Sequence, residues 1–182
     1  RVDQQRRCRV ILTRLEGPAH FFRAHTPEWA SQPLSGAGAA NKGGRLNRPG
    51  VHALYLSDSA ETAIAEYQQL SPLMPPLTLV TYEVVLHQVV DFSAGFDPAH
   101  WSPLWQELSC DWRRLAFYEE TEPPSWVLAD QVLSAGGRGV LFPSQRAAGI
   151  NLVVYPDALT PEDRLSVYDP AQRLPRDRTS WT

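Results

Sequence analysis

The clearest pattern along the chain is a run of β-branched and aromatic residues from Leu77 to Phe92. Thr, Val and Tyr recur throughout this run, and residues of these types are enriched in strands. The Pro-rich segment Ser71–Pro76 precedes it and favours a loop. The length of the run predicts one bent strand or two shorter ones.

Shorter apolar segments predict the remaining strands, which are His20–His25, Val51–Ser57, Gly139–Phe142 and Asn151–Tyr155. Val51–Ser57 alternates between apolar and polar residues, as is typical of a half-buried strand. Thr26–Pro49 is rich in Gly, Pro, Ser and Ala and is interpreted as a long loop. Loops of this length are usually functional or disordered.

A first helix is predicted from Asp58 and Glu61, which have the spacing of a capping box, and it is expected to run to about Leu70. Its apolar stripe consists of Ala60, Ala63, Ile64, Tyr67 and Leu70. Glu66 lies at the margin of that stripe. A carboxylate at this place either lines a cleft beside the core or extends to water.

Further helical structure is predicted towards the C-terminus. Pro123-Pro124-Ser125 begins a helix that Gly136-Gly137 ends, following the preference for Pro first and Gly last. Irregular helical structure is expected over Pro98–Leu115, and a short helix is expected from Thr160. Strands and helices follow without strict alternation, which predicts a single α+β domain with a small, largely antiparallel or mixed sheet flanked by helices.

Composition and charge narrow the function. The chain has 182 residues with 43% hydrophobic and 20% charged residues, which permits a sizeable core. Its formal net charge of −3 argues against direct nucleic-acid binding, which usually requires a basic face. No apolar run approaches the ~20 residues of a membrane span, so a cytoplasmic protein without membrane contact is expected. The two cysteines and five histidines lack the spacing of a metal site, and no metal is expected.

Candidate functional residues begin within Asn41–Gly50. The flexible pair Gly43-Gly44 and Arg45 can place backbone N–H groups and a guanidinium around one anion, because Arg–phosphate contacts are often bidentate. The alternative is a turn with an exposed arginine, which the short motif alone favours. Arg23, beside two phenylalanines in a predicted strand, either points to solvent or serves a site.

Three more candidates follow along the chain, and each has a structural alternative. Tyr55 stacks on a flat ring or fills the core. Glu66 stabilises a positive charge or is a solvated helix-face acid. Ser144, just after a predicted strand, donates a hydrogen bond to a substrate or caps a turn. No Gly-x-Ser-x-Gly segment or arrangement of Ser, His and Asp for nucleophilic catalysis is present.

Taken together, these segments resemble the RES-domain family, whose name records an arginine, a glutamate and a serine. The matching segments are Phe22-Arg23, Lys42–Gly50, Leu54–Ser57, Ala65-Glu66, Phe142–Ser144 and Asn151-Leu152. The motif-bearing part covers about residues 20–156 of a RES-type domain expected to span 1–169, and residues 170–182 are interpreted as a polar C-terminal tail. Many members carry Trp where this chain has Leu46, a departure that is expected to alter packing more than chemistry.

The resemblance implies a fold similar to that of the ADP-ribosyltransferase toxins and an enzyme that breaks down NAD+ by hydrolysis or phosphorolysis. It implies that Glu66 stabilises the positive charge of an oxocarbenium-like transition state. Arg23 and Arg45 would hold phosphate, with Gly44 beside them. The other substrate-binding positions implied are Tyr55, which would stack near the nicotinamide, Ser144, which would bind nicotinamide or ribose, and Asn151, which would support Ser144.

RES proteins are typically toxins of bacterial toxin–antitoxin pairs. The resemblance therefore implies a hetero-oligomeric complex with a cognate Xre-like antitoxin, and contact with DNA would be made by the antitoxin. No cofactor is implied, since NAD+ is the substrate and inorganic phosphate is a co-substrate only in phosphorolysis. Two alternatives stay open: a mono-ADP-ribosyltransferase with a protein acceptor, and a non-catalytic antitoxin-binding domain. A ribonuclease is disfavoured because the net charge is negative and no pair of catalytic histidines is evident.

Overall fold

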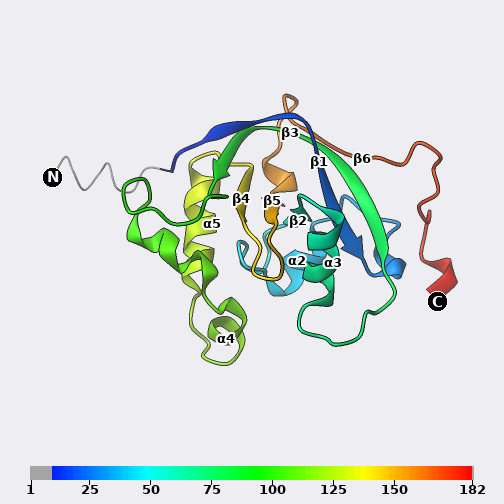
Figure 1. Ribbon diagram of the computed structural model, residues 1–182, viewed down its shortest axis with the longest axis horizontal. Helices are drawn as coiled ribbons and strands as arrows, with labels where there is room; N and C mark the ends of the chain where they lie inside the picture. Colours follow the sequence, from blue (N-terminus) through cyan, green and yellow to red (C-terminus); the bar gives the residue numbers. More distant parts are fainter. Residues whose placement is uncertain (1–9, 182) are drawn as a thin grey trace.

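Two long antiparallel strands organise the fold. The computed structural model describes residues 10–181, in which β1 (Thr13–His25) pairs with β3 (Thr78–Asp91) from end to end. The register of this pair shifts between Thr13 and Ala19, and such irregularities bend a strand. In Figure 1 the two strands arch together over the shorter ones.

Four shorter strands complete the sheet: β2 (Leu54–Ser57), β4 (Gly139–Pro143), β5 (Ile150–Val154) and β6 (Arg164–Val167). The strand order is β1-β2-β5-β4-β3-β6, and the additional β1–β3 pairing closes the first five strands on themselves. Only the β3–β4 pair is parallel among the described strands. The predicted α+β domain with a mixed, largely antiparallel sheet is confirmed.

Short helices flank this sheet. They are η1 (Pro27–Trp29), α2 (Ala37–Lys42), α3 (Ala60–Gln68), η2 (Pro103–Ser109), α4 (Trp112–Phe117), α5 (Pro124–Ser134), η3 (Pro156–Ala158) and η4 (Thr179–Trp181). In Figure 1, α5 and α3 lie on opposite sides of the group formed by β4, β5 and β2. None of the helices between residues 10 and 181 has the length and apolar character that a membrane crossing requires.

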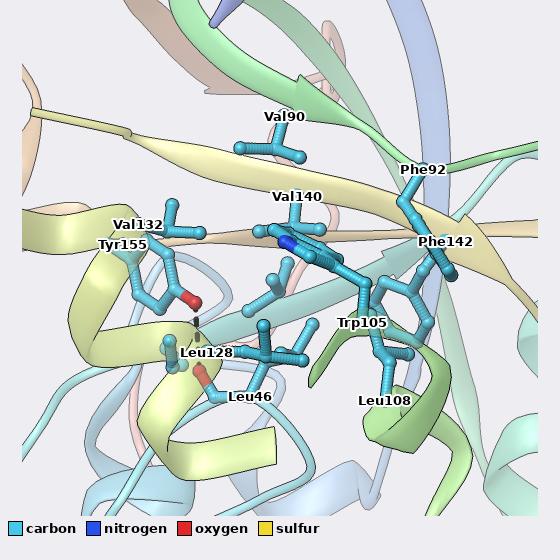
Figure 2. Close-up of a cluster of buried hydrophobic side chains, with 13 residues drawn as sticks. Leu46, Val90, Phe92, Trp105, Leu108, Leu128, Val132, Val140, Phe142 and Tyr155 are labelled. Carbon is cyan, nitrogen blue, oxygen red and sulfur yellow. Dashed lines mark hydrogen bonds between the residues drawn. The ribbon is translucent and has the colours of Figure 1, made fainter. Parts of the chain in front are cut away.

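Two apolar clusters lie on opposite faces of the short strands. Leu152 and Val154 of β5 belong to a cluster enclosed by the sheet, whereas Val153 between them belongs to the cluster that faces α5. Figure 2 shows this second cluster, in which Leu128 of α5 and Trp105 of η2 pack against the sheet. Each fully buried leucine contributes about 1.5–3 kcal/mol to stability. The two clusters hold the short strands from both sides.

Most predicted elements are confirmed. The apolar run from Leu77 to Phe92 forms one continuous strand, β3, and the helix predicted after Pro123 is α5. The strands predicted at Gly139 and Asn151 are β4 and β5. These segments have strong local signals that agree with their tertiary surroundings.

The N-terminal half needs three corrections. The first strand starts at Thr13, not His20, because its exposed polar residues are ordered by backbone pairing with β3 and show no alternating pattern. The segment 26–49 is not a continuous loop, since it contains η1 and α2. The cap of α3 is Ser59 rather than Asp58, because Ser59 is extended and its side chain accepts a hydrogen bond from Thr62 N.

The helix predicted from Thr160 is wrong. The carboxylate of Asp163 accepts hydrogen bonds from the backbone N–H groups of Thr160 and His87 and pairs with Arg138. Burial alone would raise the pKa of Asp163, but these hydrogen bonds and the Arg138 charge lower it overall. They hold residues 160–163 as a turn against β3, and the chain continues as β6.

Candidate active site

A cleft of about 430 Å³ opens where the sheet is splayed between β1 and β2. These two strands share a single residue pair, Phe22 with Ser57, whereas β2 pairs with β5 at four positions. The cleft walls come from β1, β2 and α3, from the turn after α2, from the start of α4 and from the loop after β4. Segments that are far apart in the sequence therefore meet around one opening.

Glu66 of α3 lines this cleft, as its position at the edge of the apolar stripe allows. Its Oε1 accepts hydrogen bonds from Ser144 Oγ and from Asn151 Nδ2, both at 2.7 Å. Its Oε2 accepts no hydrogen bond from any residue between 10 and 181. One carboxylate oxygen is thus fixed by the protein, and the other is available to a ligand.

Both donors to Glu66 are themselves held in place. Ser57 Oγ donates to Asn151 Oδ1 at 2.8 Å across the β2–β5 pair, so the Asn151 amide nitrogen is turned towards Glu66. Ser144 Oγ accepts hydrogen bonds from the backbone N–H groups two and three residues further on, at 3.0 and 3.2 Å. Its hydroxyl hydrogen is therefore directed to Glu66. Ser57 and Asn151 are buried, which protects the network from competing water.

The segment 43–47 forms a tight turn held by side chains. Gly44 N donates to Asn47 O at 2.8 Å, and the buried Asn47 amide donates to backbone carbonyls before and after the turn. The Tyr55 hydroxyl donates to Asn47 Oδ1 at 2.7 Å. A Cβ on Gly44 would lie 2.5 Å from Asn47 Oδ1 and 2.6 Å from the Tyr55 hydroxyl oxygen. Glycine is therefore required at position 44 for the close approach of these two side chains.

Tyr55 lines the cleft, and two hydrogen bonds fix its hydroxyl. The hydroxyl donates to Asn47 Oδ1 and accepts from Leu46 N at 2.9 Å. Burial raises the pKa of the Tyr55 hydroxyl above its ordinary value. The hydroxyl therefore stays protonated and keeps donating to Asn47.

Arg45 fastens two loops together. Its Nη1 donates to the carbonyls of Leu108 and Cys110 at 2.9 and 2.8 Å, and its Nη2 donates to Gln145 Oε1 at 2.7 Å. Gln145 Nε2 in turn donates to Ser109 O at 3.1 Å. The guanidinium has five N–H donors, so these three bonds leave two for a ligand.

Arg23 lies at the splayed edge of β1. Its Nη1 donates to Tyr55 O at 2.9 Å, whereas its buried Nε has no hydrogen-bond partner in the described part of the chain. Burial lowers the pKa of the Arg23 guanidinium, but an arginine keeps its charge at neutral pH. Arg23 therefore places a positive charge with unused donors in the cleft wall.

His25 supports this wall two residues further along β1. Its Nε2 lies 2.6 Å from the Tyr82 hydroxyl, which donates its own hydrogen to Pro33 O at 2.7 Å. The imidazole must therefore carry hydrogen on Nε2 and donate to Tyr82. Burial and, to a lesser extent, the charge of Arg23 lower the pKa of His25 to about 4. His25 is neutral at physiological pH and leaves the positive charge to Arg23.

The structure brings all seven predicted site residues to the cleft or its supporting network, and it adds others that were not predicted. The additional residues are Asn47, Ser57, Trp112, Arg113, Gln145 and Arg146. Asn47 and Ser57 lie inside the recognised segments, but their roles depend on contacts across strands. Arg113 and Arg146 belong to segments without a motif. Four arginines and a single carboxylate, Glu66, line the cleft, which favours an anionic ligand.

Two of three comparisons with known proteins found a match. The RES domain matches residues 20–177. The crystal structure of the M. tuberculosis MbcT–MbcA toxin–antitoxin complex contains a similar chain, with a TM-score of 0.58, 25% sequence identity and coverage of 84% of each chain. Curated proteins give no significant match. The RES match spans most of the chain and contains every candidate site residue from Arg23 to Asn151, so the resemblance is confirmed and the chain belongs to the RES-domain family.

Proposed function

We propose that this protein is the toxin of a bacterial toxin–antitoxin pair and that it cleaves the nicotinamide–ribose bond of NAD+. The RES domain and the similarity to a chain of a toxin–antitoxin complex support the toxin role. One observation carries the reaction: Glu66 has one oxygen fixed by two donors and one oxygen unoccupied, in a cleft lined by four arginines.

Glu66 would act on a substrate whose leaving group is already activated. The nicotinamide of NAD+ is positively charged, so the C1′–N bond breaks with its electron pair moving to nitrogen, and no general acid is needed. The ribose then carries an oxocarbenium-like positive charge, which Oε2 of Glu66 stabilises. An oxygen of water or phosphate forms the new bond to C1′. With water, one proton passes to solvent and the products are nicotinamide and ADP-ribose.

The fixed geometry of Glu66 is part of this proposal. Ser144 and Asn151 hold the carboxylate at 2.7 Å each, so its charge needs no reorientation as the ribose becomes positive. Ser144 acts through Glu66 as well, because its hydroxyl hydrogen goes to that carboxylate and its oxygen accepts two backbone N–H groups. Asn151 acts through Glu66 and Ser57 and is a positioning residue.

Substrate binding is assigned to the rest of the cleft. Arg23 and Arg45 contact the phosphates through the terminal guanidinium N–H groups that remain beside their hydrogen bonds to the protein. Gly44 lines the cleft beside them, and its lack of a side chain lets Asn47 and Tyr55 pack closely against this part of the wall. The ring of Tyr55, fixed through its hydroxyl, stacks near the nicotinamide.

The decisive experiment is to incubate the purified protein with NAD+, with and without inorganic phosphate, and to identify the products by mass spectrometry. We expect ADP-ribose with water and its 1″-phosphate with phosphate. Glu66→Gln keeps the side-chain shape and should lower turnover about 100-fold or more. Glu61→Gln is the matched control, because Glu61 is an exposed acid on the same helix outside the cleft. Intact NAD+, or full turnover by folded Glu66→Gln protein, would refute the proposal.

The same assay separates the alternatives. A mono-ADP-ribosyltransferase would transfer label from NAD+ to a protein added to the reaction. A non-catalytic antitoxin-binding domain would leave NAD+ intact, and the growth defect caused by its expression would be unchanged by Glu66→Gln. Release of free product without labelled protein supports NAD+ depletion.

We further propose that an Xre-like antitoxin forms a hetero-oligomer with this chain and blocks the cleft. The support is the toxin–antitoxin neighbour and the open cleft between β1 and β2. NAD+ turnover should stop when the antitoxin is added in equal amount. A stable complex that still consumes NAD+ would contradict this mode of inhibition.

A further inference from the structure

Two arginines of the cleft have guanidinium groups that are available to a ligand. Arg113, at the start of α4, and Arg146, in the loop after β4, both line it. Neither guanidinium makes a hydrogen bond or an ion pair with another residue between 10 and 181. In contrast, Arg23 and Arg45 already donate to protein carbonyls or to Gln145. Arginines without a partner are common on open protein surfaces. Here, however, two of them line the same cleft, and in the described part of the chain the only carboxylate in the lining of that cleft is Glu66.

Both arginines are held near their side chains by contacts with other residues. The guanidinium of Arg113 lies over the ring of the buried Trp112, 4.5 Å from its centroid. The backbone N–H of Arg146 donates to Ser144 Oγ at 3.0 Å, and Ser144 is bonded to Glu66. Each side chain therefore begins from a fixed point in the wall of the cleft that contains Glu66.

Arg45 connects the segment that carries Arg113 with the segment that carries Arg146. It binds the carbonyls of Leu108 and Cys110, shortly before Arg113, and the side chain of Gln145, directly before Arg146. Burial is the main cause that lowers the pKa of Arg45, and the positive charge of Arg113 lowers it further. Arg113 therefore lies close enough to Arg45 to interact with it electrostatically. The central arginine thus holds two flanking segments, each of which presents an unoccupied guanidinium.

We propose that Arg113 and Arg146 bind a phosphate group in this cleft, with Arg45 as the residue that positions them. Guanidinium groups bind phosphate oxygens through paired, charge-assisted hydrogen bonds. Free donors from two segments of one cleft wall suit a doubly charged or diphosphate ligand. The inference rests on the proposed function, because the phosphate would belong either to the diphosphate of NAD+ or to the inorganic phosphate that accepts ADP-ribose.

Binding by calorimetry tests this site without turnover. The ligands are ADP-ribose and inorganic phosphate, each titrated into Arg113→Gln, Arg146→Gln, the double variant and the wild type. Arg114→Gln is the matched control, because Arg114 is next in sequence but pairs with Glu119 outside the cleft. Each single substitution should weaken binding about 10-fold, and the double substitution about 100-fold. Arg113→Lys keeps the charge without the paired donors and should give an intermediate loss.

The two ligands identify the source of the phosphate. Weaker binding of ADP-ribose alone assigns the arginines to the diphosphate, and weaker binding of inorganic phosphate assigns them to the acceptor. The inference is overturned if the wild type binds neither ligand, or if the folded double variant binds both as tightly as Arg114→Gln protein. Wild-type NAD+ cleavage is measured in parallel. If the wild type cleaves NAD+ and the double variant binds both ligands as tightly as the wild type, the phosphate site is wrong but the proposed reaction stands. If ligand binding depends on the two arginines but the wild type does not cleave NAD+, the proposed reaction is wrong but the phosphate site stands.

Discussion

Acidification should destabilise this protein through His25, the buried imidazole that donates to Tyr82. Burial, and after it the charge of Arg23, lower the pKa of His25 to about 4 in the folded state, against 6.5 in an unfolded chain. Between these pH values the unfolded chain binds a proton that the folded protein rejects. The stability contributed by neutral His25 is therefore complete above pH 6.5 and is lost as the pH falls to about 4.

The size of the effect follows from the pKa difference. Each pH unit between the two pKa values corresponds to about 1.4 kcal/mol, so the complete loss amounts to about 3 kcal/mol, and about 2–3 kcal/mol of it has occurred at pH 4.5. This is a large share of the ~5–15 kcal/mol by which domains are usually stable. Urea unfolding followed by tryptophan fluorescence at pH 7.5 and pH 4.5 would measure it.

The matched variant is His25→Gln. Its side-chain amide can donate to the Tyr82 hydroxyl in place of Nε2, but it does not titrate. We expect the variant to be less stable than the wild type at pH 7.5 and to lose about 2–3 kcal/mol less between the two pH values. An equal pH dependence in both proteins would refute the assignment of a neutral, buried His25.

Three further predictions concern stability and use thermal or urea unfolding as the measurement. Gly44→Ala should cost about 1–3 kcal/mol because its Cβ would overlap the Asn47–Tyr55 contact, whereas Gly38→Ala, with nothing within 4 Å of its Cβ, should be neutral or slightly stabilising. Tyr155→Phe should cost about 1–3 kcal/mol, since its hydroxyl satisfies a buried backbone carbonyl at 2.8 Å, and an unchanged midpoint would mean that the carbonyl has another donor. Arg48→Ala, which removes half-exposed ion pairs to two acids, should cost no more than about 1 kcal/mol and should matter less at high salt; a larger cost at high salt would contradict the surface assignment.

Local sequence signals predicted those parts of the fold in which propensity and tertiary contacts agree. The β-branched run of β3 and the Pro-to-Gly boundaries of α5 are examples. The first half of β1 and the whole of β6 could not be predicted from local sequence signals, because their strand conformation comes from pairing with β3. The helix expected at Thr160 failed for the same reason, since Asp163 binds backbone N–H groups on β3 as well as in its own turn.

The candidate site divides in a similar way. The order of Arg23, Gly44, Arg45, Tyr55 and Glu66 was readable as a family pattern. The use of each residue was not, because Arg45 bonds to loops 63–100 residues away and Glu66 to donors 78 and 85 residues away. Contacts over such separations leave no periodicity or spacing for a reader of the sequence to detect.

The splayed sheet also has a consequence for when activity arises during synthesis. Glu66 leaves the ribosome well before Ser144 and Asn151, the two donors that fix its carboxylate. Strand β2 has its main partner only once β5 is available, because β1 meets β2 at a single residue pair. A nascent chain that ends before residue 151 carries the acid without its supports, and it is expected to be inactive towards NAD+. If the protein is a toxin, its activity begins only after residue 151 has been made and β5 has paired with β2, so Glu66 cannot act while the earlier segments are being synthesised.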